Sequence, residues 1–375
     1  MPNLSLEELK RLVRKIEFNK TEPELLVELV YKAMLEGENE RDRLKRVGKK
    51  SHELFRYLKN MGIFHKIKEE EPSKNLRKIP IGSVDGSFQL IGGVGNKWYV
   101  ICGISNMVAR EGFTLQPTIE VDGDIKPLEV ADEGEAHRMA EILMMLSEIK
   151  GFRRTAECLG SERESYLFID GPIIDPPLYE DPNYIEERVS AIKFCCEKNV
   201  NVVGFVKRII GANFLSFLKN KLGNEQLSDF LNDLDLLSTI MFNAINEYSS
   251  PIYTHPIDQY ANIKESLPLS YKRYKEKGLI IYYSYYKPSL RGRMFRVELA
   301  SFKELKEEEV LENFHKIMTL INKVWTLPGM EEPLPIIISH TKSNVRRGAA
   351  ETLYYEIMTK ALGDGNLHFW LEAII

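Results

Sequence analysis

Two aspartates in the sequence stand where an apolar run gives way to glycine. Asp85 follows "IPIGSV" and precedes Gly86, and Asp170 follows "SYLFI" and precedes Gly171. A single Asp-Gly pair after a strand is often only a turn. If the two strands are neighbours, however, their carboxylates lie at one edge of a sheet and repel each other unless a cation compensates them. Hard divalent cations take oxygen ligands, so the pair predicts a Mn²⁺ or Mg²⁺ site of the kind that supports phosphodiester hydrolysis.

The elements that must position the first acid follow from the periodicity of the sequence. Residues 80–90, 97–108 and 114–121 are three extended segments, and short glycine-containing connections between them favour antiparallel pairing. Residues 132–160 then carry one apolar stripe at helical spacing. The sequence therefore predicts three antiparallel strands followed by a long helix.

The second acid belongs to a region that alternates strands and helices. Strands are predicted at 165–174 and 200–209, with a helix at 185–199 between them and helices at 212–222 and 227–245 after them. Such units pair in parallel with right-handed crossovers. The fold class is therefore α/β, a mixed sheet flanked by helices. Acids at the ends of its first and fourth strands, with a helix between them, form a ribonuclease-H-like arrangement in which that helix contributes a glutamate.

The chain is expected to divide into three parts: a helical N-terminal region (1–75) that contacts a partner or a second copy, a nuclease core (76–250), and a C-terminal α+β part (251–375) that completes the site and the DNA channel. In the last part, residues 278–301 predict a hairpin that either extends the sheet or covers it as a lid. The segment "LPIIIS" (334–339) is predicted to be a strand that enters a helix.

The blocks around these acids, taken in order, resemble the NurA family of DNA-end-processing nucleases. They are spread from about residue 80 to residue 345 and read "IPIGSVDGSF", "HRMAEILMML", "YLFIDGPI", "VVGFVKR" and "PLPIIISH". The resemblance implies a ribonuclease-H-like fold and a manganese-dependent nuclease that degrades DNA from its ends and cuts single strands. It also implies a homodimer that acts with a HerA-type hexameric ATPase in DNA end resection, repair or defence.

Carried over to this sequence, the resemblance implies that Asp85 and Asp170 are metal ligands and that a glutamate of the long helix is a third. The pattern from Arg138 to Ile142 favours Glu141. Helical geometry places Glu141 and Glu148 away from the centre of the apolar stripe and Glu135 near it, so three candidates remain. The candidates are Glu141, which we prefer, and Glu135 and Glu148.

The resemblance further implies that His340, after "LPIIIS", completes the site as a ligand or as a proton donor to the leaving oxygen. A lone histidine after an apolar run is more often a structural residue. Lys207, at the end of "VVGFVK", is placed to hold a DNA phosphate, although a solvated lysine is as common. Where the family tends to have a tyrosine before the histidine, this chain has Glu331 and Glu332 in "GMEEPLP". That departure puts a tyrosine-dependent step in doubt or moves an acidic ligand into its place.

Basic and aromatic residues alternate in 271–296, and "KSNVRRG" follows His340 directly. Lysine and arginine suit a nucleic-acid backbone, and tyrosines suit stacking on unpaired bases, although alternating tyrosines are also ordinary strand residues. Local basic patches would reconcile DNA binding with the formal net charge of -4.

The remaining composition is that of a soluble globular protein. The 375 residues contain four cysteines without a CxxC pair, which we interpret as reduced thiols. The N-terminus lacks the apolar segment of a signal peptide, and no stretch reaches the ~18 apolar residues of a membrane span, so we expect a cytoplasmic protein.

Two other readings remain open. "GGVGNKW" connects two strands and does not match a phosphate-binding loop, so we interpret it as a hairpin turn. An actin-like phosphotransferase also begins with a strand that bears aspartate and a glycine-rich hairpin. A catalytically inactive adaptor of a motor ring is the non-enzymatic alternative.

Overall fold

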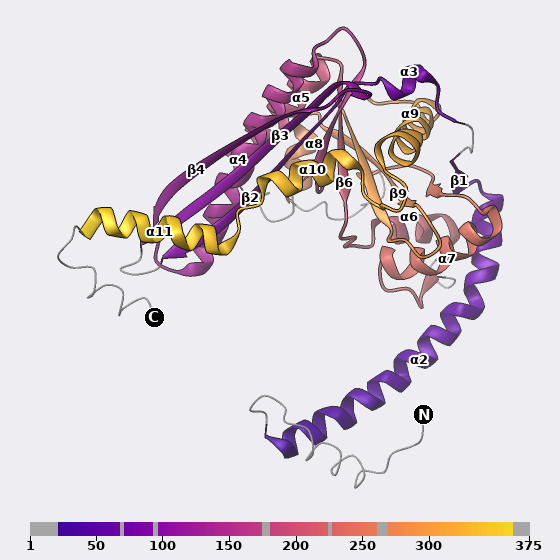
Figure 1. The fold of residues 1–375 in the computed structure, drawn as a ribbon. Helices are drawn as coiled ribbons and strands as arrows, with labels where there is room; N and C mark the ends of the chain where they lie inside the picture. Colours follow the sequence, from indigo (N-terminus) through magenta and orange to yellow (C-terminus); the bar gives the residue numbers. More distant parts are fainter. Residues whose placement is uncertain are drawn as a thin grey trace.

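The computed structural model describes residues 22–67, 71–92, 97–174, 181–223, 227–260 and 269–362. One mixed sheet of ten strands runs through this part of the chain (Figure 1). Its strands are β1 (Phe64–Lys66), β2 (Ile81–Gly92), β3 (Lys97–Phe113), β4 (Thr118–Glu129), β5 (Ser165–Asp170), β6 (Val200–Val206), β7 (Ile252–Thr254), β8 (Ile257–Asp258), β9 (Ile280–Lys287) and β10 (Phe295–Ser301). Their order across the sheet is β1-β7-β9-β10-β6-β5-β2-β3-β4, and β8 pairs with β9.

Helices cover both faces of the sheet. They are α2 (Pro23–Asn60), α3 (Lys74–Arg77), α4 (Glu133–Leu159), α5 (Pro182–Glu197), α6 (Asn213–Leu222), α7 (Asp233–Tyr248), α8 (Leu269–Glu276), α9 (Glu307–Leu320), the π-helical turn η4 (Ile321–Trp325), α10 (Leu334–Ser343) and α11 (Arg347–Leu362). One hydrophobic layer packs the sheet against α4 and α5, and another packs its opposite face against α9, η4 and α10 (Figure 1).

The central strands confirm the predicted fold class. β2, β3 and β4 pair antiparallel in sequence order, and after α4 the chain returns as β5 on the other side of β2. β5 pairs in parallel with β2 and with β6, as expected for strand-helix-strand units. The three antiparallel strands, the helix and the parallel strands therefore form the ribonuclease-H-like arrangement.

Side chains of β2 alternate between the two layers, because successive residues of a strand point to opposite faces. Phe88 faces α4, where its ring lies edge-on to His137. Ser83 faces α10 and donates a hydrogen bond to the carbonyl of Pro335 at 2.7 Å. Asp85 shares the side of Ser83, so its carboxylate is directed toward α10.

The prediction of a strand at 334–339 is wrong, because this segment is the first part of α10. The buried residues of α10 are Pro335, Ile336, Ser339 and Ser343, which recur at helical spacing. Pro335 lies in the first turn, where its missing N–H has no intrahelical partner to lose. A short apolar run has no period of its own that separates a strand from a helix. His340 is therefore presented by a helix.

The predicted hairpin at 278–301 is confirmed as β9 and β10, and it extends the sheet instead of covering it. The turn predicted at "GGVGN" falls mainly on residues 93–96, outside the described residues, and β2 and β3 on either side of it pair antiparallel as expected. All three predicted parts of the chain contribute strands to one sheet, and their boundaries stay a prediction.

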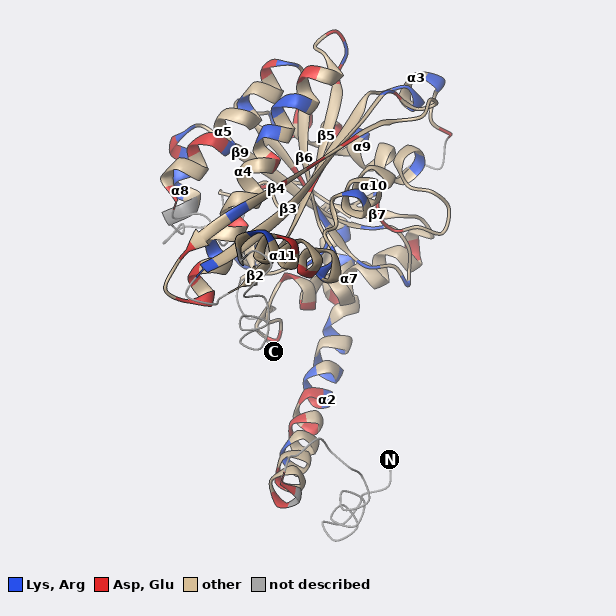
Figure 2. Ribbon diagram, turned by 60° about the vertical axis from the view of Figure 1, so that its left-hand side comes forward, with Lys and Arg blue, Asp and Glu red and all other residues tan. Residues whose placement is uncertain are grey.

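Helix α2 projects from the rest of the protein in both views and carries charges of both signs (Figures 1 and 2). Its C-terminal turns are anchored by the buried residues Leu54, Phe55 and Leu58, whereas Leu25 and Leu29 near its start are exposed. The helical residues predicted before Glu22 lie outside the described part. Within that part, no helix combines the length and the apolar character that a membrane crossing requires.

Candidate metal centre

Asp85 and Asp170 lie side by side at the point where β2 and β5 stop pairing. β2 and β5 are paired from Ile81 opposite Tyr166 as far as Val84 opposite Ile169. β5 then ends at Asp170, while β2 continues to Gly92 with β3 on its other side. The two acids are therefore the first residues past the last rung between β2 and β5. Asp170 ends its strand as predicted, whereas Asp85 lies within β2 and not at its end.

His340 joins the two acids from α10. Its Nδ1 lies 3.1 Å from Oδ2 of Asp85 and 3.5 Å from Oδ2 of Asp170. One potential ligand atom from each of the three residues lies within 4.8 Å of the others, and this is the one such group of histidine, cysteine or acidic residues among those described. The side chains of Asp85 and Asp170 are 9% and 11% exposed, whereas that of His340 is 59% exposed, so the cluster opens to solvent on the imidazole side.

Helix α10 is held against β2 by side chains on both sides of His340. Ser83 of β2 binds the carbonyl of Pro335 at the start of the helix, and Ser343 at its end donates to Oδ2 of Asp85 at 2.9 Å. Ser87 donates to the carbonyl of Ser343 at 2.6 Å. These bonds fix the imidazole over the aspartates. Sequence reasoning missed Ser343, although its spacing of three residues from His340 places both on one helical face.

The burial of the two acids has an electrostatic consequence. Burial raises the pKa of Asp85 above its usual value, and hydrogen bonding from Ser343 together with the nearby imidazole only partly offsets this. Burial also raises the pKa of Asp170, where Lys207 opposes the shift and Asp85 adds to it. Two carboxylates in this position stay charged at low cost only if a cation shares the site.

Lys207 supplies part of that positive charge. Its Nζ lies 2.8 Å from Oδ2 of Asp170 and 2.9 Å from Oε2 of Glu332. Burial alone would lower the pKa of Lys207, but its two carboxylate partners outweigh this and raise it. Lys207 is therefore part of the site and not a solvated strand-end lysine. Glu332, from the "GMEEPLP" departure, also reaches the site and binds the lysine.

A glutamate of α4 approaches from the opposite face of β2. A Cβ atom on Gly86 would lie 2.9 Å from Oε1 of Glu148, which is buried at 7% exposure. The glycine after Asp85 thus leaves the room that Glu148 occupies. Glu141 is seven residues, or roughly 10 Å, closer to the start of the helix than Glu148, and Glu135 is closer still. Of the three candidates, the geometry favours Glu148 over the preferred Glu141, and the three-residue cluster contains neither.

The donor set fits a divalent cation. Two carboxylates and one imidazole offer ligands that suit Mn²⁺ and related metals, and the carboxylates alone suit Mg²⁺. Asp85, Asp170 and Glu332 together carry more negative charge than Lys207 neutralises. A cation at this point would supply the missing positive charge.

The chain is similar to known proteins in sequence and in fold. The sequence profile of the NurA domain matches residues 53–345. The crystal structure of the NurA nuclease from Sulfolobus solfataricus aligns with a TM-score of 0.56 at 14% identity, over 88% of this chain and 96% of that one. No curated protein matches the sequence.

Endonuclease V structures align more weakly. The Bacillus subtilis protein gives a TM-score of 0.34 at 14% identity, over 81% of this chain and 92% of its own. The Ciona intestinalis protein, in complex with DNA that contains inosine, gives 0.35 at 12% identity, over 84% of this chain and 99% of its own. At 14% identity, the likeness to the Sulfolobus solfataricus structure concerns the fold. Because the domain profile covers more than half of the sequence, the chain belongs to the NurA family of nucleases.

Proposed function

We propose that the protein is a divalent-metal-dependent deoxyribonuclease that degrades DNA from its ends and cuts single-stranded DNA. The observation that carries the proposal is the convergence of Asp85, Asp170 and His340 at one edge of the sheet in a chain of the NurA family. We further propose Mn²⁺, or Mg²⁺, as the cofactor and the cytoplasm as the location.

Each residue of the site has a role in this proposal. Asp85 and Asp170 would hold the cation, with Glu148 or Glu141 as the helix ligand. When bound, the cation lowers the pKa of water and stabilises the leaving oxygen of the phosphodiester. His340 is the exposed member of the cluster and can complete the ligand set or give a proton to the leaving oxygen. Lys207 can turn from Asp170 to a DNA phosphate once that carboxylate is neutralised.

The proposed assembly is a homodimer that works with a HerA-type hexameric ATPase in DNA end resection, repair or defence. Family membership supports this assembly, and so does the exposed apolar surface of the projecting helix α2. Leu25, Leu29, Met34 and Leu35 of that helix are each between 44% and 50% exposed. Apolar side chains gathered on a projecting helix are typical of a contact surface for another chain.

End-labelled single- and double-stranded DNA, incubated with Mn²⁺ or Mg²⁺, tests the activity. We expect digestion by the wild type. The rate of digestion should fall more than about 100-fold in Asp85→Asn and Asp170→Asn, because changing a residue that only orients a metal ligand already costs up to about 100-fold. Circular dichroism would check that both variants are folded. Equal digestion by the variants would contradict the assigned site.

The same samples separate the alternatives. ATP turnover without DNA would favour the actin-like phosphotransferase. A wild-type protein that binds its motor ring but leaves DNA intact with either metal would favour the inactive adaptor.

A further inference from the structure

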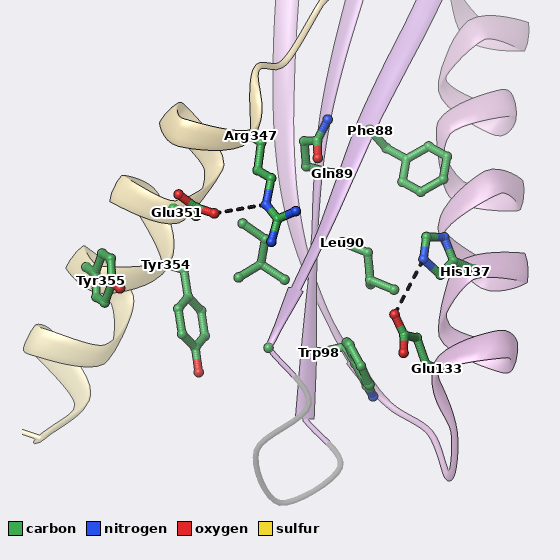
Figure 3. A pocket seen from close by; sticks show the side chains of 12 residues that line it. Phe88, Gln89, Leu90, Trp98, Glu133, His137, Arg347, Glu351, Tyr354 and Tyr355 are labelled. Atoms are coloured by element: carbon green, nitrogen blue, oxygen red, sulfur yellow. Dashed lines mark hydrogen bonds and ion pairs between the residues drawn. The ribbon is translucent and has the colours of Figure 1, made fainter. Parts of the chain in front are cut away.

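A groove of about 580 Å³ runs along β2 beyond Asp85. Figure 3 shows it between α11 on one side and α4 on the other, with the end of β2 between them. Arg347 and Tyr354 line the α11 side, and His137 lines the α4 side. Phe88 of β2 and Trp98 of β3 present half-buried aromatic rings to the groove.

This groove and the metal centre lie along the same edge of β2. In the described part of the chain, β2 has strand partners on both sides only up to Val84, and from Asp85 to Gly92 it pairs with β3 alone. This part of β2, which has a strand partner on one side, is about 23 Å long at the usual rise of a strand. Gln89, on the side of β2 that carries Asp85, donates to the carbonyl of Val345 at 3.0 Å and lines the groove. On the side of β2 that carries Asp85, the connection after α10 is bonded to Ser87 and Gln89, so a ligand held at Asp85 would reach the groove along the open edge of β2.

The chemistry of the groove suits bases better than phosphates. Among the described lining residues, the one arginine, Arg347, is already paired with Glu351 at 3.0 Å, and Glu133 adds a carboxylate 3.9 Å from His137, so they offer no free cation to a phosphate. The rings of Phe88 and Trp98 are uncharged, and an aromatic face stacks on any base. Tyr355, also a lining residue, is 45% exposed.

We propose that this groove binds the unpaired nucleotides next to the phosphodiester that is cut, by stacking their bases on Trp98, Phe88 and Tyr355. The inference rests on the proposed nuclease function, because the groove is assigned to DNA by its place on the same edge of β2 as the metal centre. The occupant is a segment of single-stranded DNA. The phosphates face outward, so the groove discriminates unpaired DNA from duplex DNA and contributes little to the salt dependence of binding.

The test measures Kd for a fluorescently labelled oligothymidylate, with Ca²⁺ in place of Mn²⁺ to hold back cleavage. The variants are Trp98→Leu and Tyr355→Leu, which keep an apolar side chain and remove the aromatic face. The control is Tyr57→Leu, the same change at a 50% exposed tyrosine of α2. Melting temperatures would check that all variants are folded.

We expect Kd for the oligonucleotide to rise about tenfold in each groove variant. The dependence of Kd on salt concentration and the Kd for a blunt duplex should not change, and the control should behave as the wild type. Unchanged Kd in both groove variants would overturn the proposal. So would a loss of self-association, measured by sedimentation, without a loss of DNA affinity, because the groove would then be an interface between two copies.

The two proposals fail separately. A wild type that cuts DNA while the groove variants keep its Kd rejects the groove and leaves the nuclease. A wild type that binds the oligonucleotide through these rings but does not cut it with Mn²⁺ or Mg²⁺ rejects the nuclease and leaves the groove.

Discussion

Two groups of buried charges in the same sheet differ in how completely the chain neutralises them. In the first, Asp85 and Asp170 face His340, whose side chain is 59% exposed. In the second, Arg296 and Glu298 of β10 form an ion pair of 2.5 Å with side chains that are 10% and 1% exposed. Glu298 also accepts a hydrogen bond of 2.7 Å from the backbone N–H of Ile173.

The comparison separates a structural cluster from the candidate metal centre. Arg296 and Glu298 balance each other one to one and are closed to solvent, so nothing further needs to bind. The metal centre carries an excess of negative charge, opens on one side, and places its acids where burial raises their pKa. A buried charge by itself therefore says little about function, whereas an uncompensated charge beside an opening predicts a ligand.

The largest expected contrast is in stability. Glu298→Gln should lower the free energy of unfolding by about 3–5 kcal/mol, because it leaves the Arg296 guanidinium buried without its counter-charge. Asp85→Asn should not lower it, because the change removes one of two repelling carboxylates. Urea unfolding of both variants measures this difference. If both variants lost the same stability, the two clusters would be alike. The double variant Arg296→Met with Glu298→Leu is the control and should recover much of the loss.

A smaller effect distinguishes the clusters by their response to metal. Mn²⁺ at about 100 times its Kd should stabilise the wild type by about 2.7 kcal/mol. Asp170→Asn should lose this gain, and Glu298→Gln should keep it in full, although its starting stability is lower. Thermal unfolding with and without Mn²⁺ provides the measurement. Equal gains in wild type and Asp170→Asn would place the metal elsewhere.

The smallest expected effect concerns the balance of charge around Lys207. Glu332→Gln leaves Lys207 with Asp170 as its one charged partner at the site, so the lysine competes more strongly with the metal. We expect metal affinity to fall about tenfold, the lower range for residues that orient a metal ligand. Titration calorimetry with Mn²⁺ measures it. The matched control is Glu331→Gln, because Glu331 binds the backbone N–H of Arg293 instead and should leave the affinity unchanged.

The sequence predicted most of the elements that bring the two aspartates together. Asp85 and Asp170 stand at the ends of apolar runs of strand length, and glycine after each one marks the end of regular burial, so local signals sufficed. The order of strands and helices then predicted that the two strands are neighbours in the sheet, because connections tend to be short and right-handed.

The parts that the sequence could not predict depend on packing between distant segments. "LPIIIS" is too short to show a period, so its helical state comes from its contacts with β2. The choice of Glu148 over Glu141 depends on which turn of α4 packs against Gly86. The periodicity of one helix does not predict this contact. The contact of Glu332 with Lys207 joins two loops far apart in the chain, and only the departure from the family pattern hinted at it.

The attachment of α10 to β2 also sets an order in time. His340 and Ser343 are 255 and 258 residues beyond Asp85 in the chain. Since ribosomes add about 5–20 residues per second, Asp85 leaves the ribosome roughly 10 to 50 seconds before the imidazole that completes its site. A nascent chain that has already formed β2 and β5 thus holds both aspartates without the histidine. The candidate metal centre is then completed late, when α10 docks.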